Sequence, residues 1–185
     1  RTHDPRRHGL WNDAVTRDVG NRTQFLSSAT GRHDGRHDCD PQANLTTSWV
    51  EPDVYKLTLA HVLIEPERDS DAVRKEPSSL DDAILESPLE NLDLVPTDIR
   101  LARFDTAPDY LMHRLNNQIR EHCQSYDLVF IDCPPQLGKL LSTALYAAHY
   151  VLIPCSADAM GLRGLSDLDY TIEQVRKNVN SNLQK

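Results

Sequence analysis

The feature that most constrains the fold of this chain is the apolar run Leu-Val-Phe-Ile at residues 128–131, which is followed by Asp132, Cys133 and two prolines. An uninterrupted apolar run of this length is typical of a strand that is covered on both faces, as in a parallel sheet. Open α/β sheets bind ligands beyond the carboxyl ends of their strands. The pattern therefore predicts a buried strand that places the Asp132 carboxylate at a ligand-binding edge.

Hydrophobic periodicity and turn residues predict two further strands and three helices. The predicted strands are residues 91–95 and 150–154, and the predicted helices are residues 108–123, 137–148 and 159–179. Strands that alternate with helices of this length predict an α/β fold with a parallel sheet and right-handed crossovers. Segment 64–90 is rich in charge, Pro and Ser, and we expect it to be a surface excursion.

Composition narrows the class of protein. A chain of 185 residues with 39% hydrophobic and 26% charged residues fits one globular domain. No stretch approaches the roughly 18 apolar residues of a membrane span, and no signal peptide is evident at the start, so we expect a cytoplasmic protein without a membrane partner. The four cysteines form no C-x-x-C pair, which predicts reduced thiols rather than a disulfide framework.

Residues 1–37 differ in composition from the rest of the chain. They hold seven Arg, four Asp and no Lys or Glu, a net charge of +3, so the other residues carry −11 of the total of −8. They also hold four of the seven glycines, and no window in them sustains helical or strand spacing. We therefore expect a poorly ordered or atypical segment 1–37 and a folded domain over 38–185.

A second group of carboxylates stands upstream of Asp132, at Asp38 and Asp40 in the sequence Asp-Cys-Asp-Pro-Gln. Carboxylates at a strand end can orient water on Mg²⁺ or position an attacking water beside a phosphate. A solvated turn is the alternative, because Asp-Pro and Asn are common in turns, and the residues alone favour the turn. A zinc site with His33, His37 and Cys39 is disfavoured because no fourth ligand is evident.

Three motifs in this order resemble the ParA/MinD family of deviant Walker ATPases, in particular its ParA/Soj branch. They are residues 38–46 (DCDPQANLT), residues 126–145 (YDLVFIDCPPQLGKLLSTAL) and residues 150–177, which contain Val-Leu-Ile-Pro and Gly-Leu-x-Gly-Leu. Residues 91–104 also resemble the family, so the resemblance covers about residues 38–183. It implies a P-loop NTPase-like parallel sheet flanked by helices, ATP and Mg²⁺ as cofactors, and a homodimer. It also implies partners, non-specific DNA and a centromere-binding adaptor protein, in the segregation of plasmids or chromosomes.

The resemblance also implies roles for individual residues. Asp40 matches the aspartate that supports hydrolysis, and Asp38 stands beside it in the first switch loop, residues 38–46. Asp132 matches the Walker B carboxylate, which acts through metal-bound water.

The second switch loop, residues 134–138, contains the remaining residues that the resemblance singles out. They are Pro134, Pro135 and Gly138. The prolines constrain the turn, and the glycine has no side chain, so the backbone can approach a phosphate closely.

The sequence departs from the family upstream of Asp38. The family has a loop of the form K-G-G-x-G-K-[ST] about twenty residues before the first switch, because its amides and ammonium groups neutralise phosphates. Here the first lysine is Lys56, and residues 9–16, around the expected place, contain one glycine. The polar run 31–37 (GRHDGRH) replaces the expected buried strand, and we do not expect it to form a central strand. Against the family, the chain is thus expected to be incomplete at both ends.

A shifted reading frame is one hypothesis for this departure. The codons GGT CGT CAC GAC GGT CGT CAC would encode residues 31–37, and read one base later they encode Val-Val-Thr-Thr-Val-Val, a good strand sequence. Two functions stay open: a partition ATPase, in a truncated or frame-disrupted copy with impaired ATP binding, or a non-catalytic interaction or dimerisation protein derived from that fold. The missing lysines favour the second for this polypeptide, and the intact switch motifs favour the first for its lineage.

Overall fold

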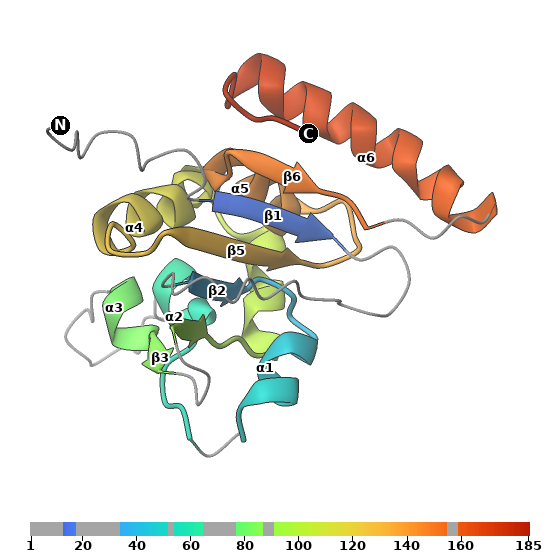
Figure 1. Cartoon of the computed structure of the whole chain (residues 1–185). Helices are drawn as coiled ribbons and strands as arrows, with labels where there is room; N and C mark the ends of the chain where they lie inside the picture. Colours follow the sequence, from blue (N-terminus) through green and yellow to red (C-terminus); the bar gives the residue numbers. More distant parts are fainter. Residues whose placement is uncertain (1–12, 18–33, 52–53, 65–76, 87–90, 155–158) are drawn as a thin grey trace, which may run out of the picture.

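The computed structural model of the chain describes residues 13–17, 34–51, 54–64, 77–86, 91–154 and 159–185 (Figure 1). Six strands form one sheet in the order β3-β4-β2-β5-β1-β6. They are β1 (Asp13–Arg17), β2 (Asp34–Asp38), β3 (Leu85–Glu86), β4 (Leu92–Val95), β5 (Leu128–Cys133) and β6 (Tyr150–Leu152). Every neighbouring pair is parallel except β3 and β4 at one edge, which confirms the predicted α/β class.

Strand β5 lies inside the sheet, between β2 and β1, as its apolar sequence predicts. Val129 and Ile131 are fully buried on it. The predicted strands at 91–95 and 150–154 are confirmed as β4 and β6, although β6 ends at Leu152. The local hydrophobic pattern was sufficient to predict these three strands, because each of them contains its own apolar residues.

Strand β2 contradicts the expectation that the polar run 31–37 does not form a central strand. Residues 34–38 pair in parallel with β4 on one side and with β5 on the other. Gly35 makes this possible at its position, because a Cβ there would lie 3.2 Å from the Tyr126 ring. His37 is buried, and no residue in the described part of the chain hydrogen-bonds its Nδ1. Main-chain pairing on both sides therefore holds a sequence of low strand propensity in the middle of the sheet.

The expectation of little structure over residues 1–37 is also wrong for β1, which pairs with β5 and β6. Strand β2 crosses the boundary that was expected between residues 37 and 38. The rest of segment 1–37, residues 1–12 and 18–33, lies outside the described residues, and its separate character stays a prediction.

Helices connect the strands and cover the sheet. The helical segments are α1 (Asn44–Trp49), α2 (Leu59–Leu63), α3 (Leu80–Ala83), η2 (Ile99–Thr106), η3 (Asp109–His113), α4 (Arg114–His122), α5 (Lys139–Ala147) and α6 (Ala159–Asn178). Helices α5 and α6 match the predicted ranges 137–148 and 159–179 closely. The helix predicted over 108–123 begins instead with the 3₁₀ segment η3, after Pro108, and continues as α4.

Segment 64–90 is not wholly a surface excursion. Its described part contains α3, in which Leu80 and Ala83 are buried, and the edge strand β3. Residues 65–76 and 87–90 lie outside the described residues.

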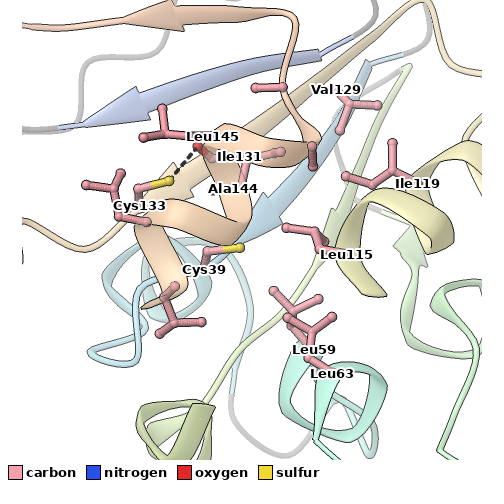
Figure 2. Packing of buried hydrophobic residues seen from close by; sticks show 14 of the residues in the cluster. Cys39, Leu59, Leu63, Leu115, Ile119, Val129, Ile131, Cys133, Ala144 and Leu145 are labelled. Atoms are coloured by element: carbon pink, nitrogen blue, oxygen red, sulfur yellow. Dashed lines mark hydrogen bonds between the residues drawn. The ribbon is translucent and has the colours of Figure 1, made fainter. Parts of the chain in front are cut away.

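The hydrophobic core joins the sheet to α2, α4 and α5 (Figure 2). Ile119 of α4 and Val129 of β5 belong to the same cluster, and so do Cys39 and Cys133. Cys39, Cys123 and Cys133 are buried and are not joined to one another by a disulfide, as predicted for small apolar residues. Within the described part of the chain, no helix combines the length and the apolar character that crossing a membrane requires.

Candidate functional site

The carboxyl edge of the sheet brings together the two acidic motifs that stand far apart in the sequence. Asp38 ends β2 and is the register partner of Asp132 on β5. On the other side of β5, position 16 of β1 is in register with Asp132 as well. Three neighbouring parallel strands therefore end at one edge, and Asp38 and Asp132 are both buried there. This is the edge at which open α/β sheets bind ligands.

The Asp38 carboxylate faces its own loop. Its Oδ1 accepts a hydrogen bond from the Asp40 amide at 3.0 Å, and its Oδ2 accepts from the amide and the hydroxyl of Thr46 at 2.8 and 2.7 Å. Burial raises the pKa of the Asp38 carboxyl to about 6, although these three donors act in the opposite direction. The residue is thus held inside the first switch loop.

Asp40 lies in a tight turn directly beyond Asp38. Its Oδ1 accepts a hydrogen bond from the Gln42 amide at 2.9 Å, and its carbonyl accepts from the Ala43 amide at 2.8 Å. Ala43 then adopts a left-handed conformation, with φ of 55°, before α1 begins. The turn that the residues alone favoured is therefore present, and it sits at the sheet edge where the family resemblance places the hydrolytic aspartate.

A main-chain hydrogen bond joins this loop to β5. The Cys39 amide donates to the Asp132 carbonyl at 2.8 Å, so the hydrogen-bonded contact with β5 continues one residue beyond the end of β2. Asp132 itself is 7% exposed. Carboxylate oxygen is a ligand type that suits Mg²⁺, and Mg²⁺ commonly keeps several water ligands, so the chemistry of a single carboxylate at this position is compatible with a hydrated ion.

The second switch loop follows β5, with Pro134 buried and Pro135 exposed, and leads into α5. At Gly138 the space in front of the backbone is filled by the Asp105 carboxylate, since a Cβ there would lie 2.8 Å from Asp105 Oδ1. The same oxygen accepts hydrogen bonds from the Lys139 and Leu140 amides at 2.8 and 3.3 Å. Asp105 therefore caps α5.

Asp105 is the residue that sequence reasoning missed at this site. It lies in η2, 34 residues before Lys139, and no local pattern links the two. The one available signal is that the positive end of a helix dipole favours a carboxylate, and the first turn of α5 contains no acidic residue of its own. The Lys139 ammonium reinforces the junction through Asp109 at 3.0 Å and the Ala107 carbonyl.

The phosphate side of the site is placed differently from the sequence-based expectation. The prediction that residues 9–16 stand in the place of the glycine-rich loop is wrong, because residues 13–16 belong to β1. A loop that follows β1 begins after Arg17, in segment 18–33, which lies outside the described residues. That segment contains no lysine either.

The described residues contain no group of three or more potential metal ligands, and the three zinc candidates cannot be compared as a set within them. His37 Nε2 lies 3.8 Å from Cys123 Sγ inside the core, and His33 is not among the described residues.

Comparison with known proteins bears directly on this site. A family profile described as an AAA domain (AAA_31) matches residues 35–185, a range that includes both switch loops. The chain is 33% identical over 150 residues to the sporulation initiation inhibitor protein Soj of Bacillus subtilis and 28% identical over 153 residues to the chromosome partitioning protein ParA of Caulobacter vibrioides. The chain belongs to the ParA/MinD family.

The alignments with these two ParA/MinD relatives cover 79% and 80% of the chain, but 55% and 53% of Soj and ParA. The chain therefore spans about half the length of the relatives it matches.

Solved structures agree in fold. The cobyrinic acid a,c-diamide synthase of Mycobacterium smegmatis, with a bound ATP analogue and magnesium, superimposes with a TM-score of 0.73 at 24% identity. That match covers 95% of this chain and 72% of the synthase. A plasmid partition protein of Borrelia burgdorferi gives a TM-score of 0.68 at 18% identity, covering 95% and 76% of the two chains. At these identities the likeness is one of fold, and it confirms the P-loop NTPase-like sheet.

Proposed function

We propose that this chain carries the magnesium side of a partition ATPase site and that, with its present sequence, it does not bind ATP. The observation that supports the first half is the register of Asp38 with Asp132 at the carboxyl edge of the sheet, with Asp40 one turn beyond. The observation that supports the second half is the absence of lysine from residues 1–55. Without ammonium groups, the β and γ phosphates would meet buried carboxylates and too little positive charge.

The residues would divide the work as in other phosphoryl-transfer sites. Asp132 would hold a water ligand of Mg²⁺, and the ion would neutralise charge on the phosphates. Asp40 would position the attacking water. Pro134, Pro135 and Gly138 would bring the second switch loop toward the phosphate. In the described structure, the space at Gly138 is taken by Asp105, so this approach requires the Asp105 cap to move.

Titration calorimetry with ATP tests the proposal, in the presence and absence of Mg²⁺. We expect no Mg²⁺-dependent binding and no phosphate release above the protein-free rate. Measurable turnover that is lost in Asp40→Ala would overturn it, and Gln42→Ala, in the same turn but with an exposed side chain, is the matched control. A binding signal that survives Asp132→Ala would count against Asp132 as the metal-directing residue.

A non-catalytic interaction or dimerisation protein is the second candidate. Large apolar side chains that are exposed favour it: Leu137 in the second switch loop is 47% exposed, Tyr110 in η3 is 62% exposed, and Ile99 in η2 is 72% exposed. A homodimer without nucleotide would appear in sedimentation equilibrium and would weaken in Leu137→Asp. A monomer over the accessible concentration range would contradict this candidate.

DNA and an adaptor protein as partners belong to the same proposal. A net charge of −11 over residues 38–185 repels a phosphate backbone, so any DNA binding needs a local basic surface and should be lost at moderate salt. Fluorescence anisotropy with a non-specific duplex at two salt concentrations tests it. We expect no binding by this polypeptide in the absence of ATP binding, and salt-resistant binding would contradict the expectation.

A further inference from the structure

We infer that Asp38 is a positioning residue, which shapes the first switch loop through Thr46 rather than contacting a metal or nucleotide. The inference deepens the proposed function, since it rests on Asp40 as the group that positions water. Its test, however, needs no nucleotide.

The hydrogen bonds of Asp38 all return to its own loop. The three donors are the Asp40 amide and the amide and hydroxyl of Thr46, which lies eight positions after Asp38. The Asp38 side chain has no exposed surface. A carboxylate that contacts a ligand must present an oxygen to the open edge of the sheet. Asp38 instead uses both oxygens on donors inside the loop.

Thr46 carries the effect of Asp38 to the next strand. Its hydroxyl donates to Asp38 Oδ2 at 2.7 Å and accepts from the Thr97 amide at 2.9 Å. Thr97 follows β4, so the relay ties the loop to the end of a strand 51 residues away. Only a hydroxyl performs both functions at this position, because valine has the same shape but neither donor nor acceptor.

The consequence concerns Asp40. Its amide is tied to Asp38, and the adjacent Cys39 amide is tied to the Asp132 carbonyl, so its main chain is anchored on both β2 and β5. A group that is preset in this way needs no reorganisation when a phosphate arrives. We therefore assign Asp38 the role of fixing Asp40 at the sheet edge.

Thiol labelling tests the assignment on the protein without nucleotide. Cys39, next to Asp38, is 1% exposed and its thiol pKa is raised by burial, so it reacts only when the loop opens. Cys123 at the end of α4 is 5% exposed and reports opening of the core elsewhere. Labelling at each cysteine is followed by peptide mass spectrometry.

We expect Thr46→Val to speed the labelling of Cys39 by about tenfold or more and to leave the labelling of Cys123 unchanged. The substitution removes the hydrogen bond to the Asp38 carboxylate, and it leaves the Thr97 amide without its acceptor. Thr46→Ser, which keeps the hydroxyl, should restore the wild-type rate. Thr143→Val is the matched control: Thr143 is equally buried, but its hydroxyl makes no hydrogen bond to any described residue, so the same exchange should leave Cys39 labelling unchanged.

Equal acceleration at Cys39 and Cys123 would indicate general destabilisation and would overturn the assignment, as would an unchanged Cys39 rate. If Thr46→Val fails to fold, hydrogen exchange of the wild-type protein decides. The Asp40 and Thr46 amides must then be protected as strongly as amides of β5, and rapid exchange would refute the inference. Failure of the proposed function would appear separately, in the ATP titration, and would leave these results unaffected.

Discussion

The Asp105 carboxylate occupies the space that any side chain at position 138 would need. Its Oδ1 lies 2.8 Å from the position of a Cβ at Gly138, and it accepts hydrogen bonds from the first amides of α5. The Asp105 cap on α5 therefore depends on the absence of a side chain at Gly138. The glycine was predicted to allow a close approach of phosphate, and in the structure it allows the close approach of a carboxylate of the same chain.

Gly138→Ala should displace Asp105 and lose the cap, so its cost should equal that of Asp105→Ala, about 1 kcal/mol each. The double variant should cost less than the sum, because both changes remove the same interaction. Urea unfolding of the three variants measures this coupling. Asp109→Ala is the control, since the exposed Asp109 ion pair with Lys139 should contribute at most about 0.5 kcal/mol. Additive losses would show that the two residues act separately.

His37→Val should stabilise the protein. His37 is buried in the central strand β2. Among the described residues its Nδ1 has no hydrogen-bond partner, and its Nε2 has only the long contact of 3.8 Å with Cys123 Sγ, whereas valine suits a strand and buries no polar atom. We expect a gain of about 1 kcal/mol, reduced by the smaller volume of valine. His61→Val is the control. Both ring nitrogens of His61 have partners, Thr58 and Arg100, so this substitution should lower the stability. A lower melting temperature for His37→Val would contradict the prediction.

His37 should also make stability depend on pH. Burial lowers the pKa of His37 to about 4, while the unfolded residue titrates near 6.5, so the unfolded state binds the extra proton between these values. Stability should therefore fall as pH decreases from about 6.5 to about 4, by on the order of 3 kcal/mol in total. Asp38 acts in the opposite direction, because its pKa is raised to about 6 and the folded state binds its proton more tightly.

The difference between wild type and His37→Val isolates the histidine from Asp38. This difference in the free energy of unfolding should grow steadily from neutral pH to pH near 4.5. Urea titrations at four pH values measure it. A difference that stays constant with pH would mean that His37 is protonated, or accessible to protons, in the folded protein.

The reading-frame hypothesis makes a prediction at the level of the gene. Read one base later, the nucleotides for residues 31–37 should encode a run of valine and threonine, and an alternative frame further upstream should encode a glycine-rich loop with lysine. Sequencing of the gene from independent isolates checks both. The hypothesis is abandoned if no frame upstream of Asp38 contains such a loop.

Local sequence was enough for the elements that carry their own apolar pattern. The run at 128–131 predicted β5 and placed Asp132 at the end of the strand, and the periodic residues after Asp158 predicted α6. Hydrophobic spacing is a property of neighbours in the chain, so it can be read without the fold. The family motifs likewise assigned Asp38, Asp40 and Asp132 to the magnesium side of a nucleotide site, and the strand register brings the first and third of them together.

Tertiary structure alone decided the rest. Residues 34–38 form a central strand because β4 and β5 supply hydrogen-bonding partners on both sides, and unpaired main-chain groups at that depth would cost more than the poor strand propensity of Gly35 and His37. The Thr46 hydroxyl bonds the Thr97 amide across 51 residues, and Asp105 caps α5 across 34. Such partners meet only when the sheet has formed. The sequence therefore predicted which carboxylates belong to the site, whereas the contacts that hold these carboxylates in place exist only in the folded chain.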